Sequence, residues 1–225
     1  MTLDIHVPAG STGHDSLTVD ISAADAGWTY SGLRVAVLEA GEALALETGD
    51  YELLVLPLAG SAAVEVGGRT YDLTGRPSVF EEITDFLYVP RRTAFTLTSA
   101  AGGRFALPAA IAVRDLPVRH LGRDQVRTDL RGAGDCSRQV NNYALNNGVE
   151  TSHLLCCEVL TPGGNWSSYP AHKHDRKGAD ERELEEIYYF EIAPSPAGGP
   201  GFGLHRTYAS SPDKPIDLCV EIHDG

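Results

Sequence analysis

Two histidines, His172 and His174, stand one residue apart in the stretch NWSSYPAHKHD, which covers residues 165–175. Side chains on a β-strand alternate between its two faces, so a His-x-His pair on a strand presents both imidazoles on the same face. Imidazole nitrogens bind divalent metals, and this spacing could therefore build half of a metal site. The alternative interpretation is a polar surface turn that carries two ordinary histidines.

A cluster of carboxylates follows in ERELEEIYYFEI, residues 181–192. One carboxylate at the start of a strand would complete a set of two imidazoles and one oxygen, which suits zinc, manganese, iron or nickel. Glu181 and Glu183 lie in a charged stretch that we expect to be a solvated loop. Glu185 and Glu186 are neighbours, so on a strand they face opposite ways. Both faces carry apolar residues, and periodicity alone does not choose between them.

The elements that would position these residues are predicted to be short antiparallel strands, because helical periodicity is scarce and turn signals recur about every 8 to 12 residues. Glycine pairs within 51–73 predict turns at Gly60–Ser61 and Gly67–Gly68, the second of them a two-residue hairpin turn. The predicted strands cover 33–40, the three parts of 51–73, 86–89, 94–98, 104–113, 152–169, 185–192, 201–208 and 216–223.

This pattern predicts an all-β chain of two β units. We expect each unit to be an antiparallel sandwich or barrel, the first over residues 1–115 and the second over 151–225, with a linker segment with local turns over 116–150. The His-x-His pair occurs only in the second unit.

Composition limits the classes of partner. The net charge of −13 over 225 residues argues against nucleic acid and anionic membranes as partners, because both require clustered Lys and Arg. No apolar run approaches the ~20 residues that span a bilayer, and the N-terminal stretch does not resemble a signal peptide. The four cysteines match no metal or disulfide framework, so we expect reduced thiols and a cytoplasmic location.

Several stretches together resemble the family of 5-deoxy-glucuronate isomerases, enzymes of inositol catabolism related to 5-keto-4-deoxyuronate isomerase. They are GNWSSYPAHKHD with ELEEIYYFEI, AGWTYSGLRVAVLEAGEALALETGDYELLVLPLAGSAAVEV, FLYVPRRT and RGAGDCSRQVNNY. The resemblance covers nearly the whole chain from about Gly27. It implies a bicupin of two antiparallel jelly-roll barrels, with one metal site in the C-terminal barrel and none in the first.

The resemblance places the metal ligands on His172, His174 and Glu186, the residue just before IYYF. It implies a divalent metal, Zn²⁺ or Mn²⁺. The family's fourth ligand is a histidine on a later strand, and the chain ends at VEIHDG where that strand would begin. His205 and His223 do not match the pattern, so we expect the C-terminal barrel to be incomplete in this chain.

The implied reaction is an aldose–ketose isomerisation of 5-deoxy-D-glucuronate to 5-dehydro-2-deoxy-D-gluconate, with a small sugar acid as the partner. Tyr188 and Glu185 are candidates for the general base; a core aromatic is the other interpretation of Tyr188. Arg138 could bind the substrate carboxylate through a bidentate fork, or pair structurally. Lys173 should point away from the ligands. An iron-dependent dioxygenase and a non-catalytic sugar-binding protein are alternatives, and the sequence leaves open whether the chain forms a homo-oligomer.

Overall fold

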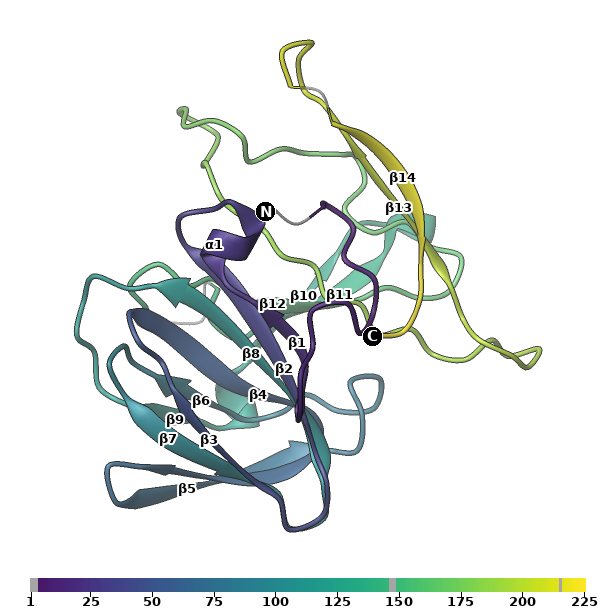
Figure 1. The fold of residues 1–225 in the computed structure, drawn as a ribbon. Coiled ribbons are helices and arrows are strands. Elements are labelled where there is room, and N and C mark those ends of the chain that lie inside the picture. Colours follow the sequence, from purple (N-terminus) through teal and green to yellow (C-terminus); the bar gives the residue numbers. More distant parts are fainter. Residues whose placement is uncertain (1–3, 146–148, 215) are drawn as a thin grey trace.

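The computed structural model describes residues 4–145, 149–214 and 216–225, and its regular structure is almost entirely β, as predicted (Figure 1). Besides one short helix, α1 (Ala23–Ala26), and the 3-10 turns η1 (Arg123–Gln125) and η2 (Gly134–Cys136), the described part contains fourteen strands. No helix in these residues is long and apolar enough to cross a membrane. The strands are β1 (Leu17–Ile21), β2 (Ser31–Leu38), β3 (Ala43–Glu47), β4 (Tyr51–Val66), β5 (Arg69–Arg76), β6 (Phe86–Val89), β7 (Ala94–Thr98), β8 (Gly103–Ile111), β9 (Arg119–Leu121), β10 (Arg127–Arg131), β11 (Arg138–Asn142), β12 (Cys157–Leu160), β13 (Gly203–Tyr208) and β14 (Asp217–Ile222).

The first nine strands form one folded unit in which every pairing is antiparallel. One layer has the order β1-β2-β8-β4-β6-β9. Strand β4 also pairs with β5 and with β7, and β7 in turn pairs with β3. The predicted strands 86–89 and 94–98 and the hairpin turn at Gly67–Gly68 are confirmed, since Val66 and Arg69 pair across that turn.

The predicted turn at Gly60–Ser61 is wrong, because β4 runs through it as a single strand of 16 residues. A bulge replaces the turn: the register shifts between Gly60 and Ala62, where β4 passes from its β8 partner to β5 and β7. Gly60 has a φ of 89°, and a Cβ there would lie 2.7 Å from the carbonyl oxygen of Gly102. Only glycine accommodates this bend without strain.

The first half of β4 is buried on both faces, because a second part of the chain covers the outside of the sheet. Leu53 and Val55 lie in the interior cluster of the first unit. Leu54 packs on the opposite face in a cluster that includes Tyr143 and Leu154 from beyond residue 140. Each large apolar side chain buried in this way stabilises the fold by about 1.5–3 kcal/mol. The two halves therefore share the second of these two clusters.

Two carboxylates anchor the halves to each other in the same manner. Glu52, fully buried in the first unit, accepts the backbone N–H groups of residues 152–154 at 2.7, 2.6 and 2.8 Å. Glu185, in the second half, accepts the N–H groups of residues 29–31 at 2.8, 2.8 and 2.9 Å. Each carboxylate satisfies three backbone donors of the other half, and we call these two contacts together the reciprocal clasp.

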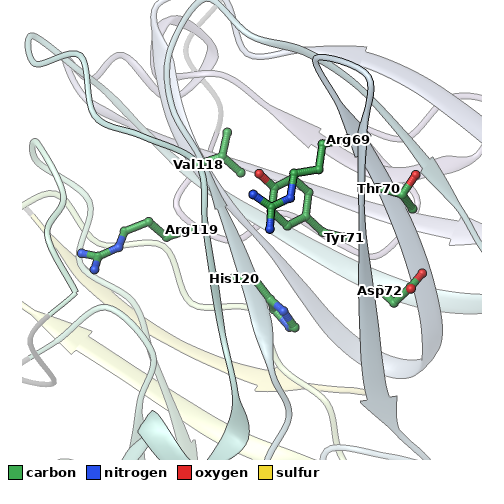
Figure 2. Close-up of a pocket in the computed structure, with 7 residues that line it drawn as sticks. All are labelled: Arg69, Thr70, Tyr71, Asp72, Val118, Arg119 and His120. Carbon is green, nitrogen blue, oxygen red and sulfur yellow. The ribbon is translucent and has the colours of Figure 1, made fainter.

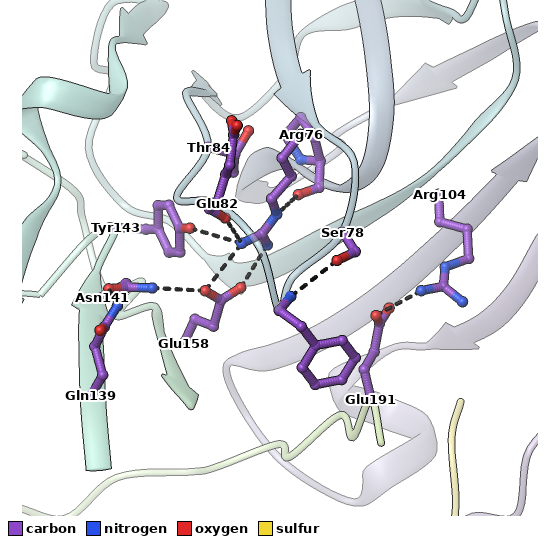
Figure 3. A network of polar contacts seen from close by, with 12 residues as sticks. Arg76, Ser78, Glu82, Thr84, Arg104, Gln139, Asn141, Tyr143, Glu158 and Glu191 are labelled. Carbon is purple, nitrogen blue, oxygen red and sulfur yellow. Dashed lines mark hydrogen bonds and ion pairs between the residues drawn. The ribbon is translucent and has the colours of Figure 1, made fainter. Parts of the chain in front are cut away.

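A buried ion pair adds a third connection (Figure 3). The Arg76 guanidinium, with no exposed side-chain surface, donates to both carboxylate oxygens of Glu158 at 3.1 and 2.5 Å. Burial opposes the charge of Arg76, but the carboxylate of Glu158 raises its pKa above the usual value. Asn141 donates to the same carboxylate at 2.9 Å, and the Tyr143 hydroxyl accepts from Arg76 at 3.5 Å. The pair joins β5 to β12.

The second half differs from the predicted strands in three places, the first being that the strand predicted over 152–169 is confirmed only at β12. The segment 116–150, expected to be a linker with local turns, contains β9, β10 and β11. Residues 185–192, expected to be a strand, carry no assigned strand, although their burial alternates from Glu185 to Tyr189. In the described residues, β10-β11-β12 and β13-β14 form two separate small sheets and not a closed barrel. The bicupin architecture therefore stays a prediction.

Candidate functional site

The His-x-His segment is held at both ends by backbone contacts. At its start, the Asn165 amide donates to the Ser137 carbonyl oxygen at 2.8 Å, and the Trp166 N–H donates to the Asp135 carbonyl oxygen at 2.7 Å. These contacts tie the segment to the turn between β10 and β11. At its end, the Leu184 N–H donates to the His174 carbonyl oxygen at 2.9 Å, so the histidines lie beside the entry to the glutamate cluster.

Two pairs among the three predicted metal ligands lie near each other, His172 with His174 and His174 with Glu186. The rings of His172 and His174 meet edge to face, with centroids 5.0 Å apart. His174 Nε2 lies 3.9 Å from Glu186 Oε1, and His174 Nδ1 lies 3.2 Å from the Arg182 carbonyl oxygen. Two ligands on a tetrahedral metal would be about 3.4 Å apart, so this His–Glu separation is close to that of a coordinating pair.

The side chains of His172, His174 and Glu186 are not arranged around a single point. Across the described ranges, no three or more His, Cys, Asp or Glu side chains lie close enough to one another to hold a metal ion as they stand. The donor types fit a divalent metal of intermediate hardness, and the His174–Glu186 separation fits as well.

Glu185 and Glu186 face opposite ways, and the structure distinguishes their environments. Glu185 is engaged by the backbone of residues 29–31, on the side that packs against the first unit. Glu186 points to the opposite side, where its carboxylate lies near His174 and accepts from the Tyr188 hydroxyl at 3.4 Å. Glu185 is therefore an anchor and not a free general base.

Tyr188 belongs to a small aromatic group beside the ligands. Its ring stacks on Phe190 with a centroid distance of 6.2 Å, and both rings lie 5.7 Å from His205 on β13. Desolvation, together with the carboxylate of Glu186, raises the pKa of Tyr188 to about 12, although 52% of the residue is exposed. Its exposure does not fit the alternative of a core aromatic.

His205 is a neighbour of Tyr188 that the sequence pattern did not predict. Burial lowers the pKa of its imidazole, and its Nε2 lies 2.8 Å from the Thr207 hydroxyl. Alternation along the predicted strand 201–208 was the available signal, but it does not reveal which segment packs against that face.

Lys173 and Glu181 are less solvated than the sequence suggested. Lys173 Nζ lies 2.6 Å from a carboxylate oxygen of Glu181 and 3.0 Å from one of Asp175. The Glu181 carboxylate, followed by that of Asp175, raises the pKa of Lys173. Lys173 therefore points away from the two histidines, as expected. Its side chain does not extend freely into solvent, because its two ion pairs hold the charged stretch around Glu181 in place.

Arg138 opens β11, next to the turn that holds the His-x-His segment. Its Nη1 donates to the Cys136 carbonyl oxygen at 3.2 Å. In the described part of the chain it forms no salt bridge, so its remaining N–H donors are available to an anion.

An open hollow of about 610 Å³ lies elsewhere, over β5 and β9 of the first unit (Figure 2). It is lined by Arg69, Thr70, Tyr71, Asp72, Val118, Arg119 and His120, and none of the predicted site residues is among them. Arg69 lies over the ring of Tyr71 at 4.7 Å, and His120 Nε2 lies 3.0 Å from the buried Asp85. We place the candidate site at His172, His174, Glu186 and Tyr188, away from this hollow.

Comparison with known proteins gives the site its context. Residues 5–225 match the KduI/IolB family. The chain belongs to this family. A KduI/IolB relative from Geobacillus kaustophilus (strain HTA426), named 5-deoxy-glucuronate isomerase, is 33% identical over 222 residues, which cover 97% of this chain and 78% of the relative. A relative of the same name from Bacillus subtilis (strain 168) is 32% identical over 209 residues, covering 92% and 75%.

A solved structure agrees with the KduI/IolB assignment. An IolB-like protein from Salmonella typhimurium LT2 superimposes with a TM-score of 0.85 at 32% identity, over 95% of this chain and 80% of that protein. The resemblance noted from the sequence is thereby confirmed, and membership of this family indicates that the chain is an isomerase.

Proposed function

We propose that this KduI/IolB chain is a cytoplasmic, metal-dependent aldose–ketose isomerase that converts 5-deoxy-D-glucuronate to 5-dehydro-2-deoxy-D-gluconate in myo-inositol catabolism. The observation that carries the proposal is that Glu186 lies 3.9 Å from His174, whose ring meets that of His172, and accepts from the Tyr188 hydroxyl. The names of the relatives support the choice of substrate.

The metal would be Zn²⁺ or Mn²⁺, held by His172, His174 and Glu186. When bound, such an ion acts as a Lewis acid toward a carbonyl and the neighbouring hydroxyl. This makes the proton on the carbon next to the carbonyl more acidic. The carboxylate of Glu186 adds the negative charge that a site with two neutral imidazoles otherwise lacks.

Two further residues have proposed roles toward the substrate. Tyr188 would exchange a proton with the reacting hydroxyl, because its own hydroxyl lies at the ligand carboxylate and half of the residue is exposed. Glu185 is excluded from that role by its three backbone contacts. Arg138 would bind the substrate carboxylate, because a guanidinium fork matches a carboxylate.

The reciprocal clasp supports the bicupin arrangement, with a first barrel over 1–115, a connecting segment over 116–150 and a second barrel over 151–225. If Glu52 and Glu185 are equivalent, then Leu53 takes the position of Glu186. Leu53 is fully buried in the core of the first unit. An apolar core residue in place of the carboxylate ligand supports a first unit without metal.

The test is an activity and metal analysis of the purified chain. The wild type should consume 5-deoxy-D-glucuronate, which is measured as the loss of the aldehyde signal. It should also contain a divalent metal. Changing His172 and His174 together to alanine should remove both, whereas His223→Ala, a matched change at an exposed histidine, should leave both intact. Isomerisation that persists without metal, or oxygen uptake in its place, would overturn the proposal.

A further inference from the structure

Two arginines face each other across the strands β10 and β11. Arg131 pairs with Arg138 in the antiparallel register, so their Cβ atoms are about 4.5–5.5 Å apart on the same face of the sheet. Like charges placed directly opposite each other destabilise a sheet. An anion bound between them would remove that cost.

The local structure neutralises this pair only in part. Arg131 Nη2 lies 3.4 Å from the carboxylate of Asp129, at the limit of a useful contact. Asp129 lies closer to another arginine, at 2.9 Å from Arg127 Nε. Arg138 donates only to a backbone carbonyl and has no carboxylate partner among the described residues. The pair therefore retains unused donors and uncompensated charge.

The pair lies on the face that turns toward the candidate site. Alternation along β11 puts Arg138 and Asn142 on one face, and Cys157 of β12 is directly opposite Asn142. Burial raises the pKa of the Cys157 thiol, and the charges of Arg131 and Glu186 act on the same thiol with opposite effects. The contacts of residues 165–166 with the turn between β10 and β11 bring the His-x-His segment to the same side.

Resting on the proposed function, we infer that Arg131 and Arg138 together bind the carboxylate of the sugar acid, and that Arg131 determines the preference for an acid over a neutral sugar. Two guanidinium groups across a pair of strands can hold one carboxylate by parallel N–H···O bonds. The carboxylate is far from the reacting carbons of a hexuronic acid, so Arg131 is a specificity-determining residue and not a catalytic one.

Arg127 is the matched control. It lies on the same strand and the same face, and it shares the carboxylate of Asp129 with Arg131. It differs in that its cross-strand partner is Asn142, a neutral residue, and that its side chain is more exposed, 59% against 43%. Replacing either arginine removes a cation from Asp129, and Arg127 is the closer of the two, but only Arg131→Gln removes half of the arginine pair.

The experiment measures KM and kcat of the whole chain for 5-deoxy-D-glucuronate and for 5-deoxy-D-glucose, the analogue with an alcohol in place of the carboxylate. Arg131→Gln and Arg138→Gln should raise KM for the acid about 10- to 100-fold with little change in kcat, the usual effect of losing a hydrogen bond to a charged group. Neither change should affect the alcohol. Arg131→Lys should lie in between, because it keeps the charge without the fork.

Two outcomes would overturn the inference: Arg131→Gln equal to Arg127→Gln for the acid, or an equal loss for both sugars. Direct titration with D-glucuronate, a ligand of the same charge, separates this inference from the proposed function. If the wild type binds glucuronate with dependence on Arg131 but turns over neither sugar, the function is wrong and the carboxylate site stands. If turnover is normal and glucuronate binding does not depend on Arg131, the carboxylate site is wrong.

Discussion

Changing Glu185 to glutamine should weaken the contact between the two halves of the chain without removing the proposed metal ligands. In the wild type, one oxygen of Glu185 accepts the Thr29 N–H, and the other accepts those of Tyr30 and Ser31. Glutamine has one acceptor oxygen and one NH₂ group. If the oxygen keeps two of these N–H groups, the NH₂ group faces the third, and two donors meet.

The change therefore removes one charge-assisted hydrogen bond and takes the charge from two others. A hydrogen bond to a charged group contributes about 1.5–3 kcal/mol, and partial exposure of the Glu185 site places the total near the lower end, at about 2 kcal/mol. For a chain of this size, each kcal/mol moves the thermal midpoint by about 2–4 °C, so we expect a decrease of about 4–8 °C.

Glu186→Gln is the control, because it makes the same chemical change one residue along on the opposite face. Among the described residues, its carboxylate has contacts with His174 and Tyr188, at 3.9 and 3.4 Å, so the midpoint of the metal-free protein should barely move. Metal affinity should instead fall 10-fold or more, since even residues that contact a ligand without touching the metal cost that much. The assays are thermal unfolding by circular dichroism after chelation, and metal content after dialysis.

The opposite result would contradict these roles for Glu185 and Glu186: Glu185→Gln would empty the metal site and leave the thermal midpoint unchanged, and Glu186→Gln would lower the midpoint and keep the metal. That result would mean that the alternation of residues 185–189 is off by one.

Three further predictions concern the rest of the chain. Arg76→Met leaves the mostly buried Glu158 carboxylate without its cation and should cost about 3 kcal/mol, measured by urea unfolding; an unchanged midpoint would contradict a role for this pair. Burial raises the pKa of Asp85, but the N–H groups of Gly75 and Thr74 and the imidazole of His120 together hold it below its usual value. Its carboxylate thus stabilises the fold above about pH 4, and this contribution is lost as the pH falls through the lowered pKa. Asp85→Asn should make stability less steeply dependent on pH below about pH 4, and an equally steep profile would argue against it. All four cysteines are free in the structure, and thiol titration of the unreduced, denatured protein should give four thiols, whereas two or fewer would indicate a disulfide.

The local pattern was enough where one strand and its turn decide the structure. The hairpin at Gly67–Gly68 and the strands 86–89 and 94–98 follow from alternation and from the φ angles that glycine permits, both of which are properties of neighbouring residues. The His-x-His motif likewise marked the candidate site, because two imidazoles one residue apart are an uncommon arrangement with a specific use. The all-β class followed from the same short-range signals.

Tertiary structure decided which face each of these residues takes. Nothing near Glu185 in the sequence distinguishes it from Glu186; the choice comes from backbone donors at residues 29–31, more than 150 positions away. The same holds for Gly60, where close approach to Gly102 converts an expected turn into a bulge, and for Arg131 and Arg138, whose opposition depends on the register of two strands. Local propensity sets where strands form, but burial and charge are satisfied only by partners that the chain brings together on folding.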